Sequence, residues 1–448
     1  MHEKKKLGVI SLGCDKNRVD SEKLLASISN DYQITSDVSE AQIIVVNSCA
    51  FLESARKEAI ETALECSEYK QNGALERLIL TGCLPQRFIG ELFDDFTEVD
   101  GFLGTYDYNL FNQTIAECYQ GKRVNNVGKG GEKVFGKCRM ITTPLHYAYL
   151  KIADGCNNKC TYCLIPSIRG GYFSHPIEKI IEEAENLGDI SELILVAQDV
   201  TRYGVDLYGE KCLVKLIREL SKLENISSIR LLYCYPDMID DELIEELKNN
   251  DKLIKYLDIP LQHASSRVLK RMNRRGTNES YLALVSKLKK EIPSISLRST
   301  FIAGFPGETQ EDFETLKDFI SKAKLTNAGF FAYSKEEGTP AFKLPDQIDD
   351  KVKKVRVKEL YALQKQISKE FLASFKGKTI DVICDGIDYD KGCFVGRAYF
   401  QAPDIDGKVY FTSNDEIVVN QGEVYTVKIT KTTNYDLYGR VLWIYLTK

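Results

Sequence analysis

The sequence has no long apolar run, no excess of basic charge and no signal-peptide core. None of its hydrophobic stretches approaches the roughly 18 residues that suggest a membrane span, so no membrane segment is expected. The 65 acidic residues outnumber the 60 basic ones, for a net charge of −5, which gives no support to a chain-wide electrostatic grip on nucleic acid. The apolar stretch at 7–12 is too short for a secretion signal and favours a first strand. We therefore expect a cytoplasmic protein.

Length and composition indicate a globular protein of several domains. The 448 residues suggest about three domains at roughly 150 residues each. A hydrophobic content of 43% and a charged content of 28% make long disorder unexpected. The 13 cysteines are many for a reducing compartment, where grouped thiols more often bind metal or take part in catalysis than form disulfides. Most of them are scattered, as buried apolar residues are, but two groups of three are not.

Cys156, Cys160 and Cys163 form a compact triplet within eight residues. A tetrahedral zinc site would need a fourth ligand, normally from a second Cys/His pair, and His146 and His175 do not have that spacing. An iron–sulfur cube is also held by thiolates. With only three of them, one iron has no protein ligand and can chelate a small molecule. A plain zinc knuckle, or cysteines that are close by coincidence, are the alternatives.

Cys14, Cys49 and Cys83 form a dispersed triplet in which each cysteine has a similar context. Helix-like stretches lie between them, at 21–28 and 54–69. Each cysteine follows a short β-branched or Leu-rich run typical of a buried parallel strand, at 7–13, 43–48 and 77–82.

Successive strand–helix units of this kind make one parallel sheet, and such sheets bind ligands at the carboxyl ends of their strands. We therefore expect the three thiols of the dispersed triplet to converge there and to hold a second three-thiolate cluster with an open iron. Three unrelated buried cysteines are the alternative.

The spacing C-x3-C-x2-C of the compact triplet is the signature of radical S-adenosylmethionine (SAM) enzymes. Together, the two triplets resemble the methylthiotransferases of that superfamily over nearly the whole chain. Four stretches are similar to the RimO branch, which modifies a ribosomal protein: 11–22, 149–156, 165–170 and 402–407. Branches that modify tRNA tend to have Gln-Met-Asn, or a related triplet, where this chain has Asp-Lys-Asn at 15–17.

The resemblance implies a multidomain α/β protein. A parallel α/β cluster domain would be followed by a partial TIM-type radical SAM barrel, a helical linker and a small antiparallel β-barrel of the TRAM (OB-like) type. The predicted boundaries are 1–125, 142–345, 346–376 and 377–448. The chain itself has strand-like runs after the cluster loop, separated by helix-like runs such as 176–187. These strand-like runs lie at 192–197, 229–235, 256–261, 296–302 and 329–333.

The resemblance also implies two 4Fe-4S clusters and SAM. All six cysteines of the two triplets would be cluster ligands and catalytic residues. One SAM would be split at the compact triplet to give a 5′-deoxyadenosyl radical, and a second would methylate sulfur on the open iron of the dispersed triplet. Tyr162 would lie next to the adenine, Gly170 and Gly171 at the amino group, and Gly304 and Glu308 near the ribose and methionine. Each of these loops could also be an ordinary connection between a strand and a helix, and His263 could be a structural histidine.

The substrate implied by the RimO resemblance is an aspartate of ribosomal protein S-twelve, modified at its β-carbon. Residues 378–448 carry eight basic and ten acidic side chains, whereas a barrel that grips RNA should be basic on one face. RNA contact is therefore possible but not indicated. A tRNA adenosine methylthiotransferase is the nearest alternative, and a non-catalytic metal-cluster RNA-binding protein is a second. We expect a monomer that receives electrons from a donor such as flavodoxin or ferredoxin.

Overall fold

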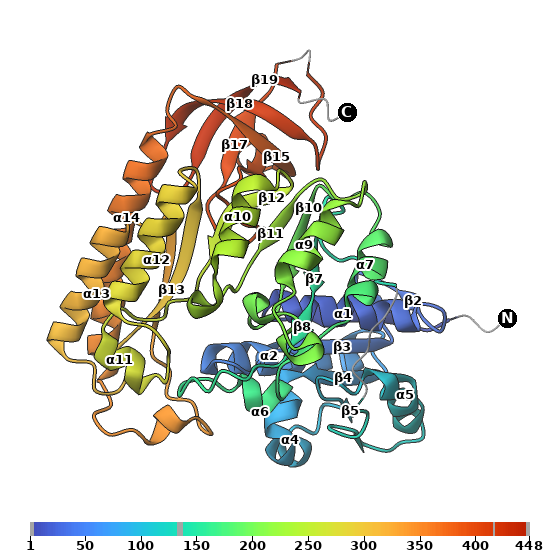
Figure 1. The fold of residues 1–448 in the computed structure, drawn as a ribbon. Helices are drawn as coiled ribbons and strands as arrows, with labels where there is room; N and C mark the ends of the chain where they lie inside the picture. Colours follow the sequence, from blue (N-terminus) through green and yellow to red (C-terminus); the bar gives the residue numbers. More distant parts are fainter. Residues whose placement is uncertain (1–3, 132–137, 415–416, 445–448) are drawn as a thin grey trace. The chain divides into compact units, whose positions relative to one another are not determined.

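The computed structural model describes residues 4–131, 138–414 and 417–444. The chain, drawn in Figure 1, divides into two compact units. The first unit contains Met1–Thr142, Tyr149–Leu187 and Glu336–Thr339. The second contains Thr143–Ala148, Gly188–Lys335 and Pro340–Lys448. Both cysteine triplets therefore lie in the first unit.

A six-stranded parallel sheet forms the centre of the first unit, with the strand order β2-β1-β3-β4-β5-β6. All six residues of β3 are buried, as expected for a parallel strand that is covered on both faces. The strands are β1 (Lys6–Ser11), β2 (Gln33–Ile34), β3 (Ile43–Ser48), β4 (Arg77–Gly82), β5 (Gly101–Phe102) and β6 (Val124–Asn125).

The first unit also contains several helices and a short antiparallel strand pair, β8 (Ala153–Asp154) with β9 (Phe173–Ser174). The helices are α1 (Asp15–Ile28), α2 (Glu53–Ser67), α3 (Tyr69–Asn72), α4 (Cys83–Asp95), α5 (Phe111–Tyr119), α6 (Ile165–Arg169) and α7 (Ile177–Glu185). Parallel strands need such crossover connections, because a tight hairpin cannot join them.

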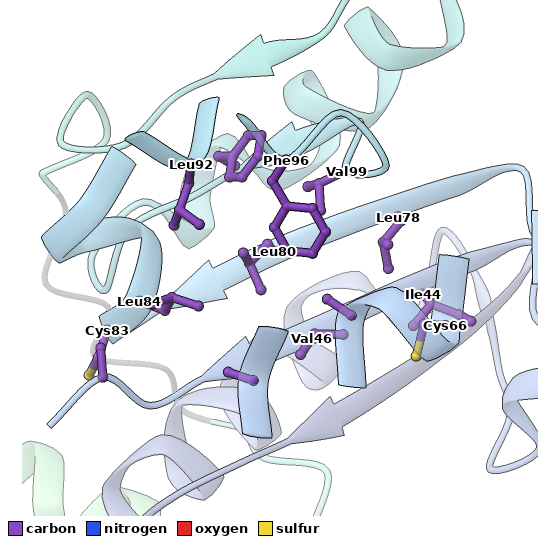
Figure 2. Close-up of a cluster of buried hydrophobic side chains, with 14 of the residues drawn as sticks. Ile44, Val46, Cys66, Leu78, Leu80, Cys83, Leu84, Leu92, Phe96 and Val99 are labelled. Carbon is purple, nitrogen blue, oxygen red and sulfur yellow. The ribbon is translucent and has the colours of Figure 1, made fainter. Parts of the chain in front are cut away.

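Alternate side chains of the central strands enter two separate cores, as the pleat of a strand requires. Val46 and Leu80 point into a cluster that also contains Phe96, which follows α4 (Figure 2). Val45 and Ile79 point to the opposite face and pack with residues of α1 and α5. The two cores hold β1, β3 and β4 firmly side by side, and this fixes the positions of the loops that follow them.

A second sheet lies in the other unit, with the order β14-β13-β12-β11-β10-β7, so its strands are arranged in their order along the chain. The strand pairs from β10 to β14 are parallel, and Figure 1 shows α9, α10 and α12 along the same side of this sheet. The strands are β7 (Tyr147–Lys151), whose last residues belong to the first unit, β10 (Glu192–Val196), β11 (Ile229–Leu231), β12 (Leu253–Asp258), β13 (Ser296–Ala303) and β14 (Asn327–Ala332).

Helices connect the strands of this sheet and link it to a closed five-stranded barrel with the order β15-β16-β17-β19-β18. The helices are α8 (Val205–Tyr208), α9 (Leu213–Ser221), α10 (Asp241–Asn249), α11 (Ser266–Arg271), α12 (Asn278–Glu291), α13 (Gln310–Ala323) and α14 (Asp350–Ala373). The barrel strands are β15 (Thr379–Asp388), β16 (Cys393–Arg397), β17 (Val409–Thr412), β18 (Val424–Thr432) and β19 (Leu437–Ile444). The predicted fold class is confirmed: two parallel α/β sheets are followed by a small β-barrel.

Buried ion pairs fasten the small barrel to the second sheet within the second unit. Glu192, at the start of β10, pairs through Oε2 with Nη1 of Arg397 on β16 at 2.5 Å. The Nε of the same arginine lies 2.8 Å from Asp385 on β15, and Asp385 also contacts Nε2 of His146 at 2.8 Å. Because these charges are removed from water, they are stable only as a fully paired set. The barrel is therefore part of this unit.

Two elements differ from the sequence prediction. The helix predicted at 21–28 begins earlier, at Asp15, because its first turns are polar and buried: Lys16, Asn17 and Asp20 are all shielded from water, so no apolar period marks them. The strand predicted at 229–235 ends at Leu231, and Tyr233 has a left-handed φ of 62° through which a strand cannot continue. No helix within the described residues has the length and apolarity needed to cross a membrane.

Candidate functional site

The dispersed triplet lies where three adjacent strands end. β3 pairs with both β1 and β4, and Cys14, Cys49 and Cys83 follow soon after β1, β3 and β4. A Cβ atom on Gly13 would lie 3.1 Å from Sγ of Cys49, so the loops that carry Cys14 and Cys49 touch. A Cβ atom on Gly82, next to Cys83, would lie 2.6 Å from the carbonyl oxygen of Ser48, next to Cys49. The convergence expected from the sequence is therefore present in the fold.

Burial and helix ends act on these thiols in opposite directions. Burial raises the pKa of Cys83 to about 12, although the nearby Arg169 opposes the rise. Burial, followed by the neighbouring Cys14, also raises the pKa of Cys49. Cys14 is the N-cap of α1 and Cys83 is the first residue of α4, where the helix dipole favours negative charge. A metal that takes these thiols as ligands must displace their protons.

Gly82 allows the chain to turn sharply from β4 into Cys83. Its φ of +94° belongs to the left-handed region, which disfavours every residue with a Cβ atom. A Cβ atom there would also lie 2.3 Å from Oδ1 of Asn47 and 2.6 Å from the carbonyl oxygen of Ser48. This close approach of backbone to the end of β3 brings Cys83 towards the other two cysteines.

The compact triplet lies in the loop between β8 and α6. The backbone N–H of Asn158 donates to Sγ of Cys156 and that of Ile165 donates to Sγ of Cys163, both at 3.4 Å. Cys156 and Cys160 are buried, and Cys163 is half-buried. Hydrogen bonds from backbone N–H groups to cysteine sulfur tune iron–sulfur clusters. This loop is therefore built to hold sulfur atoms that carry negative charge.

Arg169 lies between the two triplets and was not singled out in the sequence. Its Nη2 is 2.6 Å from Oδ1 of Asn17 and 4.0 Å from Sγ of Cys83. Its Nη1 is 2.8 Å from Oδ2 of Asp154, two residues before Cys156. These contacts join residues that are far apart in sequence, so periodicity gives no sign of them. The sequence offers one sign of a buried polar partner: Asn17 and Asp20 are polar residues in the first turns of α1, which are buried.

The donor chemistry of both triplets fits iron–sulfur cubes. Within the described part of the chain, no three His, Cys, Asp or Glu side chains are close enough to share one metal ion. In a cube, the three thiolates bind three separate irons, so their sulfur atoms can lie farther apart than the ligands of a single metal ion. Thiols that are shielded from water and approached by N–H groups or an arginine suit such a cluster.

The predicted SAM contacts lie in two different parts of the chain. Tyr162 is half-buried and Gly170 and Gly171 are exposed, and all three lie in the first unit with the compact triplet. Gly170 has a φ of +72°, and nothing lies within 4 Å of the position that a Cβ atom would take. Its carbonyl oxygen accepts the N–H of Cys156 at 3.2 Å. The glycine stretch is therefore both open to solvent and tied to the loop of the compact triplet.

Gly304 and Glu308 belong to the second unit. The Glu308 carboxylate accepts the N–H of Gly304 at 2.7 Å and pairs with Arg356 of α14 at 2.6 Å. His263 is fully buried, accepts the N–H of Ser265 on Nδ1 at 2.9 Å and lies 3.4 Å from Glu308. These contacts give His263 and Glu308 a structural role in the turn, and the predicted contact of Glu308 with SAM stays a prediction.

Three family models match the chain, and together they span most of it. The Radical SAM superfamily matches residues 150–320, Uncharacterized protein family UPF0004 matches residues 6–104, and the TRAM domain matches residues 377–442. The first match contains the compact triplet, and the second contains the dispersed triplet.

Curated relatives match over their full length. A "Ribosomal protein uS12 methylthiotransferase RimO" of Lachnoclostridium phytofermentans is 48% identical over 97% of this chain and 99% of that protein. A protein of the same name from Clostridium botulinum (strain Eklund 17B) is 47% identical over 98% of each chain.

Solved structures share the fold at low identity. The radical SAM methyltransferase TsrM from Kitasatospora setae, solved with cobalamin and a [4Fe-4S] cluster, has a TM-score of 0.56 at 14% identity, over 76% of this chain and 77% of that one. The cobalamin-dependent SAM radical enzyme OxsB has a TM-score of 0.52 at 11% identity, over 81% of this chain and 56% of that one. At these identities the likeness concerns the fold alone.

Proposed function

Because this chain belongs to the RimO family of radical SAM methylthiotransferases, we propose that it transfers a methylthio group to ribosomal protein uS12, on the β-carbon of an aspartate. The observation that carries the proposal is the presence of two cysteine triplets in one compact unit. Relatives named for this activity match from end to end. That favours it over the two alternatives, a tRNA adenosine methylthiotransferase and a non-catalytic metal-cluster RNA-binding protein.

In this proposal, Cys14, Cys49 and Cys83 hold one 4Fe-4S cluster, and Cys156, Cys160 and Cys163 hold the other. When bound, the clusters and SAM supply one-electron chemistry and sulfur transfer that no side chain offers. A C–H bond beside an ionised carboxylate is too weakly acidic for a side-chain base to remove its proton. Reaction at this carbon therefore requires one-electron chemistry.

The protein's own contribution is to position the clusters and keep them dry. The sheet edge holds the dispersed triplet through the buried strands β1, β3 and β4. In the compact triplet, the N–H groups of Asn158 and Ile165 stabilise negative charge on two sulfur atoms. Burial of Cys83, Cys156 and Cys160 keeps water away from the groups that they would carry.

The residues that we assign to SAM come from two stretches of the chain. We propose that Tyr162 lies next to the adenine of SAM. We also propose that Gly170 and Gly171, which are exposed beside the compact triplet, bind its amino group. Gly304 and Glu308 would shape the turn near the ribose and methionine, since the Glu308 carboxylate already holds that turn in place.

Further features of the proposal rest on the sequence. They are a cytoplasmic location, a monomeric state, an electron donor such as flavodoxin or ferredoxin, and domain boundaries near 125, 142, 345 and 376. The family matches at 6–104, 150–320 and 377–442 are compatible with these boundaries.

The test is mass spectrometry of uS12 from a strain that lacks this gene and is complemented with variants. C14A should cleave SAM but leave uS12 unmodified, whereas C156A should neither cleave SAM nor modify uS12. C66A replaces a buried cysteine of α2 outside both triplets and should restore full modification. Methylthio groups on tRNA adenosine instead of uS12, or thiolation by the C14A variant, would refute the proposal.

A further inference from the structure

Arg169 is a buried cation whose guanidinium contacts one cysteine triplet and whose backbone ends α6, the helix that follows the loop of the other. Its side chain is only 2% exposed. On one side, Nη2 lies 4.0 Å from Sγ of Cys83 and 2.6 Å from Oδ1 of Asn17, and that same oxygen is 3.8 Å from Sγ of Cys83. The guanidinium and the Asn17 amide thus hold the Cys83 sulfur from two directions.

Carboxylates and a lysine fix the guanidinium in this position. Asp154 accepts from Nη1 at 2.8 Å and Asp20 accepts from Nη2 at 3.0 Å. Lys151 pairs with Asp154 at 2.8 Å and also with Asp20. Two cations and two anions therefore form a closed, buried set. Such a set is rigid, because moving one member away leaves another charge unpaired in a medium of low dielectric.

The backbone on either side of Arg169 extends this arrangement to the compact triplet. Its carbonyl oxygen accepts the hydroxyl of Tyr106 at 2.9 Å. The carbonyl oxygen of the next residue, Gly170, accepts the N–H of Cys156 at 3.2 Å. A Cβ atom on Gly155 would lie 2.2 Å from the carbonyl oxygen of Gly171, so the two loops are in close contact. Two consecutive residues, Arg169 and Gly170, thus connect the Cys83 sulfur to the Cys156 backbone.

We propose that Arg169 is a positioning residue that couples the two triplets: its guanidinium stabilises added negative charge on the cluster held by the dispersed triplet, and its backbone fixes the loop of the compact triplet. This inference rests on the proposed function, which supplies the clusters. A fixed cation beside a ligand sulfur favours the reduced cluster, because reduction adds one negative charge. Arg169 therefore raises the reduction potential of that cluster.

The experiment isolates one cluster and measures its potential. In the full-length chain, the triple substitution C156A/C160A/C163A leaves only the dispersed triplet able to hold a cluster. Anaerobic redox titration followed by electron paramagnetic resonance then gives its midpoint with and without R169Q. We expect R169Q to change the ratio of reduced to oxidised cluster at a fixed potential by at least about tenfold towards the oxidised form, which is about 59 mV for one electron.

A second variant should shift the midpoint potential in the opposite direction. D20N removes an anion from beside the guanidinium with almost no change in shape, so it should raise the midpoint. R169K retains the positive charge and should bring the midpoint back towards the wild-type value. R139Q removes another buried arginine of the same unit, one that pairs with Glu183 at 3.1 Å; it should leave the midpoint unchanged even where it lowers the unfolding temperature of the apoprotein.

The outcomes separate this inference from the proposed function. If the wild-type chain holds no cluster at the dispersed triplet, the proposed function fails. If it does hold one and neither R169Q nor D20N moves the midpoint, or both move it in the same direction, the role of Arg169 is refuted. If R169Q does not fold, as judged by circular dichroism, D20N alone decides: a raised midpoint supports the inference, and an unchanged or lowered one overturns it.

Discussion

Cys14, Cys49 and Cys83 are separated by 34 or 35 residues and meet through the pairing of β1, β3 and β4, whereas Cys156, Cys160 and Cys163 share eight residues of one loop. The dispersed triplet exists only when the parallel sheet is folded. The geometry of the compact triplet is largely local, with N–H groups two residues away donating to its sulfur atoms. Two sites of similar chemistry therefore depend on the fold to different degrees, and perturbing the sheet should separate them.

Of the changes that should affect the dispersed triplet and spare the compact one, G82A is expected to have the largest effect. The new methyl group would meet Asn47 at 2.3 Å and a backbone oxygen of Ser48 at 2.6 Å, at a φ of +94°. We expect a loss of more than about 3 kcal/mol in the stability of the first unit, measured as faster hydrogen exchange of the amides of β3 and β4. Iron binding at the dispersed triplet should fall while the compact triplet still binds.

G170A is the matched control for this substitution. Gly170 also has a positive φ, +72°, but nothing lies within 4 Å of its Cβ position. Only the conformational penalty of about 1 to 3 kcal/mol remains. Equal destabilisation by the two variants would show that the contact at the end of β3 does not hold the dispersed triplet together.

In the folded apoprotein, the thiol of Cys83 should react about 100-fold or more slowly than that of Cys163 in the compact triplet. Burial raises the pKa of Cys83 from 9.0 to about 12, so its thiolate fraction near pH 8 falls by about 1,000-fold. Cys163 is half-buried and should be alkylated much sooner. Because the pKa is raised, the rate at Cys83 should continue to increase with pH towards 12 and not level off near 9.

Timed alkylation followed by peptide mass spectrometry measures both rates in one sample. In urea, where the sheet is unfolded, Cys83 should react as fast as Cys163. Equal rates in the folded protein would contradict the burial of Cys83.

The smallest effect is expected from Y106F, which removes the hydrogen bond from Tyr106 to the carbonyl oxygen of Arg169 at 2.9 Å. The loss should be about 1 kcal/mol and should appear as faster hydrogen exchange in residues 165–171, with the amides of β3 unchanged. Y69F, at the start of α3 in the same unit, should change neither. A loss of protection spread over the whole first unit would mean that Tyr106 supports the sheet and not the connection between the triplets.

Much of this architecture follows from the sequence alone. The apolar runs before Cys14, Cys49 and Cys83 predicted parallel strands, and the pairing of β1, β3 and β4 confirms them. A helical linker was predicted at 346–376, and the structure has one long helix within that range, α14 (Asp350–Ala373). These elements have one apolar side or are wholly apolar, so their hydrophobic patterns specify them.

The polar connection between the triplets could not be predicted in this way. Arg169 and Asp20 are 149 residues apart in the chain, and no local pattern pairs them. Asn17 and Asp20 are buried in the early turns of α1, although residues of these types usually lie on the surface. Their burial depends on partners supplied by Lys151 and Arg169, so only the assembled tertiary structure accounts for it.

The central claim, that each triplet holds its own iron–sulfur cube, is tested most directly by iron and sulfide analysis of the anaerobically reconstituted protein. We expect about eight irons per wild-type chain and about four in each of two triple variants, C14A/C49A/C83A and C156A/C160A/C163A. A dispersed-triplet variant that retains as much iron as the wild-type chain would contradict the account.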